Sequence, residues 1–273
     1  MIWKLTDRFI LILDVETANS LDDALVYDIG WRIIDLFGRV YAEGSFVIRD
    51  IFVYERKIVK EAYYADKIPE YVTDIQQGKR EMVNFMEARR RILNIMKHFN
   101  CHTVAAYNAY FDRNALNTTL RFLTKSKYRY FFPYSTEFVC IWNMACNSIC
   151  QQSEYKTFAE TNYHFSNHGK NYRATAETVY AFLTNNANFT EKHKGLDDVK
   201  IECEIFVKCF EELGGVMSIN RLCWRSVKRG ALMLSVNFML ISGRPALQTL
   251  NLTLNIISAI LYTSNEGGHH HDC

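Results

Sequence analysis

The segment from Ile10 to Thr17, ILILDVET, carries two carboxylates directly after an uninterrupted apolar run. An apolar run that ends abruptly in charge is typical of a buried β-strand with functional groups at its end. Strand side chains alternate between two faces, so Asp14 and Glu16 point to the same side while Val15 points into the packing. Because two neighbouring carboxylates repel each other, we expect a divalent cation to bind between them.

A third acidic residue follows a second predicted strand, Thr103–Tyr107. The pattern predicts a helix from about Tyr110 to Leu123, with Asp112 in its first turn. The positive end of the helix dipole favours a negative charge there, next to the strand ends. Asn108 occupies the corner between strand and helix, where its amide can contact a carboxylate or a substrate.

The third acidic segment, HKGLDD, precedes a helix that is predicted to begin near Leu196. Five helical residues turn through about 500°, so His193 and Asp198 would lie on different faces if both were helical. Gly195 indicates instead that His193 lies in a mobile loop, from which it can approach as a base while Asp198 binds a metal ion. Asp197 is the alternative ligand, but the spacing favours Asp198 and predicts that Asp197 caps the helix.

Together these segments contain the motifs D-x-E (Asp14–Glu16), N-x-x-x-D (Asn108–Asp112) and H-x-x-x-x-D (His193–Asp198). They resemble the motifs of the DnaQ-like (DEDD superfamily) 3′–5′ exonucleases of the histidine type. No motif residue is missing, and the resemblance covers about residues 9–213. The resemblance implies metal binding by Asp14, Glu16, Asp112 and Asp198, general-base catalysis by His193, and substrate contacts by Thr17 and Asn108.

The chemistry expected of such a site uses two Mg²⁺ or Mn²⁺ ions about 4 Å apart, which bind the attacking water and the leaving 3′ oxygen. Carboxylates suit these hard ions, and a histidine of pKa near ~6.5 can accept the proton of the water. The expected partner is a nucleic acid with a free 3′ end, with single-stranded DNA favoured over RNA, and a replication or repair protein is a further possible partner. The alternatives are an exoribonuclease that trims RNA and an inactive nucleic-acid-binding module on the same fold.

The order of predicted elements favours an α/β fold. Strands are predicted at Phe9–Asp14, Val26–Leu36 and Val40–Ile48, as an antiparallel meander. Helices then alternate with the strand at Thr103, which predicts a ribonuclease-H-like mixed sheet flanked by helices. We therefore expect an exonuclease domain over residues 1–213 and an extension over residues 214–273 of uncertain structure and unknown role.

The charge of the chain excludes one class of nucleic-acid binder. The formal net charge is only +2, so a strongly cationic, histone-like binder is not expected. Local patches occur at Arg89–Arg91, in a helix predicted over Glu81–Phe99, and at Lys125–Phe131, where basic and aromatic residues alternate. The arginine run is more typical of a solvated helical face, whereas the second patch fits either a solvated face or contacts with phosphates and bases.

The chain has eight cysteines. The N-terminal MIWKLTDRF lacks an apolar signal segment, so we expect free thiols and a cytoplasmic location. Cys146, Cys150, His164 and His168 have a spacing within zinc-finger limits. The favoured alternative is that EFVCIWNMACNSIC forms one amphipathic helix, in which both cysteines are small apolar residues.

The C-terminal extension is basic and apolar. It contains no Asp or Glu between Leu213 and Asn265. Its apolar stretches are too short or too polar for a bilayer-spanning helix, so no membrane association is expected. The alternation of leucines from Leu250 to Ile256 favours a strand. The extension can be a small module that packs on the exonuclease domain or a partner, or one that helps hold nucleic acid.

Overall fold

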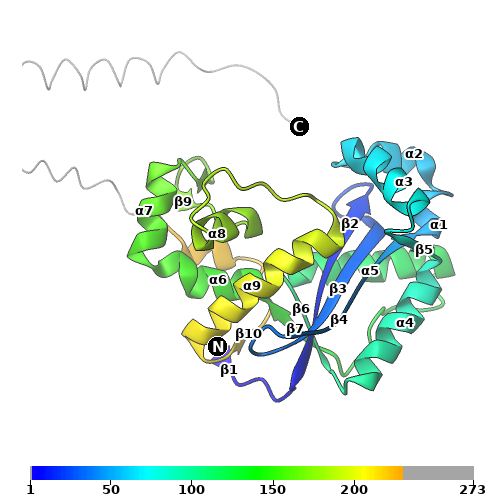
Figure 1. The fold of residues 1–273 in the computed structure, drawn as a ribbon, viewed down its shortest axis with the longest axis horizontal. Helices are drawn as coiled ribbons and strands as arrows, with labels where there is room; N and C mark the ends of the chain where they lie inside the picture. The colour runs from blue at the N-terminus through cyan, green and yellow to red at the C-terminus, as the bar shows by residue number, and fades with distance from the viewer. Residues whose placement is uncertain (1, 230–273) are drawn as a thin grey trace, which may run out of the picture. The chain divides into compact units, whose positions relative to one another are not determined.

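The computed structural model describes residues 2–229. Its centre is a six-stranded mixed sheet with the strand order β5-β4-β3-β2-β6-β7 (Figure 1). Strands β2 (Phe9–Ala18), β3 (Leu25–Asp35) and β4 (Val40–Ile48) form an antiparallel meander. Strands β6 (Thr103–Ala106) and β7 (Glu137–Cys140) add in parallel on the other side of β2. This topology confirms the predicted ribonuclease-H-like α/β fold.

The apolar run of β2 is uninterrupted because both faces of this strand are covered. Leu11, Leu13 and Val15 pack with α4 (Phe85–His98) and α5 (Ala109–Thr124) in one core. Ile10 and Ile12 face a second core, to which α6 (Ile141–Asn147) and α9 (Gly195–Leu213) contribute (Figure 1). Since side chains alternate along a strand, Asp14 and Glu16 lie on the α9 side of the sheet.

The remaining elements surround this sheet. An insertion between β4 and β5 (Glu81–Val83) contains only short helices. The insertion consists of α1 (Arg49–Phe52), α2 (Arg56–Lys60), η1 (Ala65–Lys67) and α3 (Ile68–Gln76). The elements between α6 and α9 are η2 (Ile149–Gln151), α7 (Ser153–Thr161), β8 (Phe165–Ser166), β9 (Asn171–Tyr172) and α8 (Ala176–Leu183). After α9 come β10 (Val216–Met217), which pairs with β1 (Ile2–Trp3), and η3 (Cys223–Ser226).

Two predicted helices are wrong in part, because each begins with a short edge strand. Residues predicted as the start of a helix at Glu81 form β5, which pairs in parallel with β4 before α4 begins at Phe85. Likewise EFVC forms β7 on β6, and α6 follows it. Such strands obtain their hydrogen bonds from a distant neighbour, which local periodicity does not reveal.

Cys146 and Cys150 are free and fully buried in an apolar core. They lie in different helical segments, α6 and η2, so the predicted i,i+4 relation within one helix is wrong. His168 is exposed and His164 is half-buried. Within the part of the chain that the structure describes, neither group of side chains that could hold a metal ion contains these four residues.

The arginine run Arg89–Arg91 is committed to the fold, whereas Lys125, Lys127 and Arg129 of the second patch are exposed, so both interpretations of that patch stay open. Arg90 and Arg91 form ion pairs with Glu87 at 2.6 and 2.7 Å, as expected of a solvated helical face. Arg89 donates a hydrogen bond of 2.7 Å to the Phe131 carbonyl, and the Phe131 side chain is fully buried.

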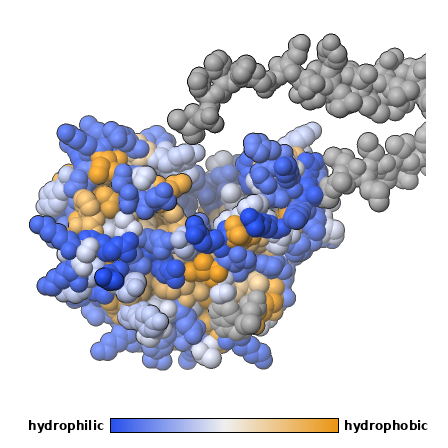
Figure 2. All heavy atoms as spheres, turned by 180° about the vertical axis from the view of Figure 1, so that it is seen from behind, coloured by the Kyte–Doolittle hydropathy of each residue, from blue (hydrophilic) through white to orange (hydrophobic). Residues whose placement is uncertain are grey.

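The predicted C-terminal extension is described only up to Arg229. Residues 214–229 belong to the compact unit Met1–Arg229, in which η3 lies against α6. The strand predicted at Leu250–Ile256 lies outside the described residues, and the division into 1–213 and 214–273 stays a prediction. From residue 2 to residue 229, no helix combines the length and the apolar character needed to cross a bilayer. On the face shown in Figure 2, hydrophilic residues surround smaller hydrophobic patches.

Candidate active site

Strand β2 presents Asp14 and Glu16 to a cavity of about 1030 Å³. Glu16 is 7% exposed, and burial together with repulsion from Asp198 raises its pKa to about 8. Burial, followed by repulsion from Glu202 and Glu16, raises the pKa of Asp14 well above its usual range. Both pKa values are raised for the same two reasons: burial disfavours the charged form of each carboxyl group, and neighbouring carboxylates repel it.

Asp112 reaches this cavity from the first turn of α5 and is 5% exposed. Burial raises its pKa to about 7, although its carboxylate accepts a hydrogen bond from the Val15 backbone, which works in the opposite direction. Asp112 therefore lines the same cavity as the two carboxylates of β2. Asn108, at the N-cap of α5, also lines the cavity.

Asp198 lies in the first turn of α9, and its Oδ2 accepts a hydrogen bond of 3.0 Å from the Lys194 N–H. Its Oδ1 is buried and has no hydrogen-bond partner within residues 2–229. Burial raises the pKa of Asp198 to about 7. The predicted cap by Asp197 is wrong: Lys194 is the N-cap, and Asp197 instead lies 3.5 Å from Lys200 and 3.7 Å from Lys192.

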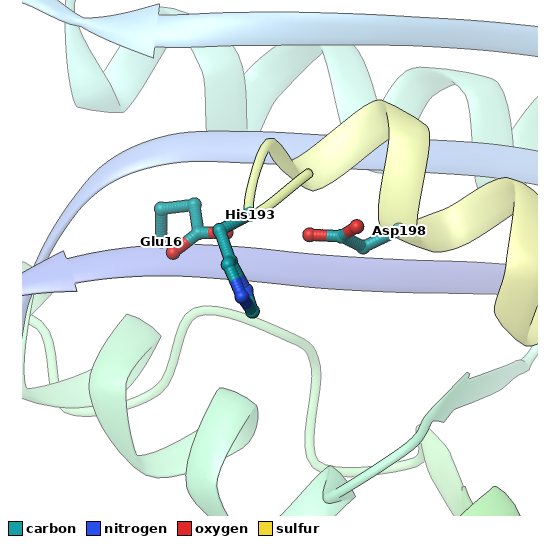
Figure 3. A group of neighbouring side chains, drawn as sticks. All are labelled: Glu16, His193 and Asp198. Atoms are coloured by element: carbon teal, nitrogen blue, oxygen red, sulfur yellow. The ribbon is translucent and has the colours of Figure 1, made fainter. Parts of the chain in front are cut away.

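The two ends of the H-x-x-x-x-D motif meet the D-x-E strand. Ligand atoms of Glu16, His193 and Asp198 all lie within 4.8 Å of one another, close enough to hold a metal ion. In Figure 3 the carboxylate of Asp198 points from α9 toward Glu16, and His193 lies on the segment before this helix. The cavity is lined by every residue that the sequence predicted for the site: Asp14, Glu16, Thr17, Asn108, Asp112, His193 and Asp198. Their catalytic roles stay predictions.

Two further carboxylates of the cavity were not predicted. Glu202 lies one turn after Asp198 on α9, is 3% exposed, and accepts a hydrogen bond of 3.2 Å from the Tyr107 N–H. Burial raises the pKa of Glu191 to about 8, and Glu191 forms a second close group with Glu177 and His193. The i,i+4 spacing from Asp198 could have indicated Glu202, whereas no local signal distinguishes Glu191.

This set of side chains fits hard divalent cations. The donors are carboxylate oxygens, which Mg²⁺ and Mn²⁺ prefer, and the Asp198 Oδ1 is a buried acceptor with no donor. Burial raises the pKa of Glu16, Asp112 and Asp198, so their charged forms are disfavoured unless a cation binds beside them. Burial lowers the pKa of His193, which favours its neutral imidazole.

The insertion between β4 and β5 holds the segment that carries His193. The Tyr64 ring stacks on the His193 imidazole, with centroids 3.8 Å apart and planes inclined by 11°. The Lys194 Nζ lies 2.7 Å from Glu70 and 3.2 Å from Asp74, both on α3. His193 itself has a φ of +54°, a left-handed conformation that is uncommon for residues other than glycine.

A buried aspartate fixes the same segment from the sheet side. Asp28 on β3 is fully buried and accepts hydrogen bonds from the Gly195 N–H at 3.1 Å, Tyr71 Oη at 2.8 Å and Arg80 at 2.7 Å. Gly30 on β3 lies against the backbone of Gly195. A Cβ at position 30 would overlap that backbone, so only glycine allows this close approach. The position of His193 therefore depends on close backbone contact between β3 and the start of α9.

The raised carboxylate pKa values predict how stability depends on pH without metal. The folded state binds protons that the unfolded chain releases near pH 4, so the free energy of unfolding should fall as pH rises from about 4 to about 8. In EDTA we expect Tm to decrease over this range, and excess Mg²⁺ should reduce the decrease near pH 8. Thermal melts at pH 5.5, 7 and 8.5 check this.

A matched Glu16→Gln variant should show a shallower decrease of Tm, because it lacks one of the groups that take up a proton on folding. A Tm that is constant or rises with pH in EDTA, in both proteins, would contradict the electrostatic description of the cavity.

Comparisons with known proteins match solved structures only at low sequence identity. No family model and no curated protein sequence matches the chain. A product-bound exonuclease I has a TM-score of 0.48 and 14% identity over 76% of this chain and 44% of its own. E. coli exonuclease I with a 5cy-dT13 oligonucleotide has a TM-score of 0.45 and 12% identity over 73% of this chain and 39% of its own.

The zinc-ion-bound form of the E. coli ExoI–ssDNA complex has a TM-score of 0.42 and 14% identity, with the same coverage of 73% and 39%. The alignments thus span less than half the length of these exonuclease I chains. The site itself is defined by this chain's own geometry: a ribonuclease-H-like sheet that presents a buried carboxylate cluster and one neutral histidine to a single cavity.

Proposed function

We propose that this protein is a metal-dependent 3′–5′ exonuclease that releases nucleoside 5′-monophosphates from the 3′ end of single-stranded DNA. The observation that carries the proposal is the convergence of three distant motifs on one cavity. Asp14 and Glu16 come from β2, Asp112 comes from α5, and His193 and Asp198 come from the start of α9. An inactive nucleic-acid binder would gain nothing from this cluster, since carboxylates without metal repel phosphate.

The four motif carboxylates would hold two Mg²⁺ or Mn²⁺ ions, which when bound neutralise the negative charge at the scissile phosphate and acidify the attacking water. His193, as a neutral base that lines the cavity, takes the proton from this water. The water oxygen forms the new bond to phosphorus, and the bond from phosphorus to the 3′ oxygen of the preceding nucleotide breaks. The released nucleotide therefore keeps the phosphate on its 5′ oxygen.

Thr17 and Asn108 would contact the terminal nucleotide. A register shift between Glu16 and Thr17 interrupts the regular pairing of β2 with β3 directly after the carboxylates. Thr17 and the exposed Asn108 both line the cavity, so their polar groups are available to a sugar or base. Because both side chains line the cavity together with the metal-binding candidates, contacts with them would align the terminal phosphodiester for attack.

Digestion of matched oligonucleotides tests the proposal. DNA and RNA of one sequence, labelled at either the 5′ or the 3′ end, are incubated with Mg²⁺, Mn²⁺ or EDTA. We expect the 3′ label of DNA to appear at once as a mononucleotide, the 5′ label to form a ladder that shortens with time, and no product in EDTA. Preferential digestion of RNA would identify RNA rather than DNA as the substrate. Absence of product with both ions would refute the proposed function.

A further inference from the structure

The cavity extends well beyond the carboxylates. Its lining also includes Trp142, Tyr172, Arg173 and Trp224, which belong to none of the three motifs. We call these four residues the tryptophan end of the cavity. A cavity of about 1030 Å³ reaches the upper limit of about 1000 Å³ that is usual for small-molecule pockets, so it has room for more than one nucleotide.

Both tryptophans lie on helical elements of the fold and are half-buried. Trp142 lies in the first turn of α6, packs on the small residues Ala106, Ala109 and Cys140, and donates its backbone N–H to the Tyr107 carbonyl at 2.8 Å. Trp224 lies on η3, which packs against α6. Indole rings that are fixed in position and still line a cavity are suitable stacking surfaces for nucleic-acid bases.

Positive charge accompanies the two tryptophans. Arg173 is exposed and lines the cavity, and Arg225, which does not line it, has its guanidinium 5.4 Å from the Trp224 ring centroid. Within residues 2–229, neither arginine forms an ion pair, whereas Arg32, Arg80 and Arg229 do. An arginine without a carboxylate partner next to an aromatic ring can bind the phosphate between two stacked bases.

We propose that the tryptophan end binds the nucleotides that precede the scissile phosphodiester, with bases stacked on Trp142 and Trp224 and phosphates bound by Arg173 and Arg225. This inference rests on the proposed exonuclease function and adds to it a preference for strands of several nucleotides over a dinucleotide. In a duplex both faces of a base are already covered by its neighbours, so a paired strand cannot use the indole surfaces.

The dependence of hydrolysis on substrate length tests this inference. The measured quantity is the ratio of kcat/KM for a ten-nucleotide single strand to kcat/KM for a dinucleotide of the same base. In Trp142→Ala and Trp224→Ala we expect this ratio to fall by about 5- to 100-fold, mainly through KM of the longer strand. Trp142→Phe and Trp224→Phe should restore most of it, because phenylalanine still stacks. Tyr134→Ala is the matched control, since Tyr134 is 98% exposed and does not line the cavity.

The outcomes separate the inference from the proposed function. If the tryptophan variants keep the wild-type ratio of kcat/KM for the longer strand to kcat/KM for the dinucleotide, whether or not their overall activity falls, the tryptophan end does not bind the strand. If the wild type hydrolyses neither substrate, the proposed function fails. Fluorescence anisotropy of a labelled ten-nucleotide strand then still decides the inference: the alanine variants should bind at least about 5-fold more weakly than the wild type, and equal binding would overturn it.

Discussion

An Asp14→Asn variant is expected to release mononucleotides at least about 1000-fold more slowly than the wild type, with Mg²⁺ or Mn²⁺. The carboxylates of this cavity are proposed to bind the ions that stabilise charge at the scissile phosphate, and such stabilisation amounts to several kcal/mol, with each ~1.4 kcal/mol worth tenfold in rate. Steady-state release of labelled nucleotide from a single-stranded DNA measures the effect.

The same variant should be more stable than the wild type in EDTA. Asp14 is crowded by Glu16, Asp112 and Glu202, and asparagine removes one negative charge from this cluster at nearly constant volume. Asp22→Asn is the matched control, because Asp22 is exposed and does not line the cavity. Wild-type turnover in Asp14→Asn would eliminate the proposed mechanism, and a lower Tm in EDTA would show that the carboxylate stabilises the fold.

Replacing His193 by glutamine is expected to lower kcat by about 100- to 10,000-fold, the usual contribution of a general base. A Gly30→Ala variant should produce a large part of the same loss without altering any proposed catalytic residue. The added methyl group would overlap the backbone of Gly195 and Leu196, and would therefore push the His193 segment away from β3. Overpacking of this kind also costs about 1–3 kcal/mol of stability, which thermal melts can measure.

A double-mutant cycle shows whether the two changes act on one group. If Gly30 serves catalysis by allowing His193 to reach its position, Gly30→Ala should have little further effect on kcat in the His193→Gln background. Independent, multiplicative losses would mean that Gly30 affects the site by another route. A His193→Gln enzyme with wild-type kcat would remove His193 from the mechanism.

Several elements could be predicted from the sequence because their signals are local. The meander of β2, β3 and β4 was predicted from runs of apolar residues, and the structure confirms it, with β4 at Val40–Ile48 as predicted. Helix α5 also begins within one residue of its predicted start. The edge strands β5 and β7 were missed, because a strand of three or four residues is defined mainly by its neighbour's hydrogen bonds.

The residue types and spacing of the three motifs were sufficient to select the side chains that the structure brings to one cavity, since strand alternation and the first turn of a helix are local geometries. Their surroundings could not be predicted in this way. Tyr64 stacks on His193 across a long stretch of chain, Asp28 reaches Gly195 from β3, and the tryptophan end combines α6 with η3. Such contacts depend on how distant elements pack against one another. The close approach of Gly30 to Gly195, for example, cannot be predicted from the sequence around either residue.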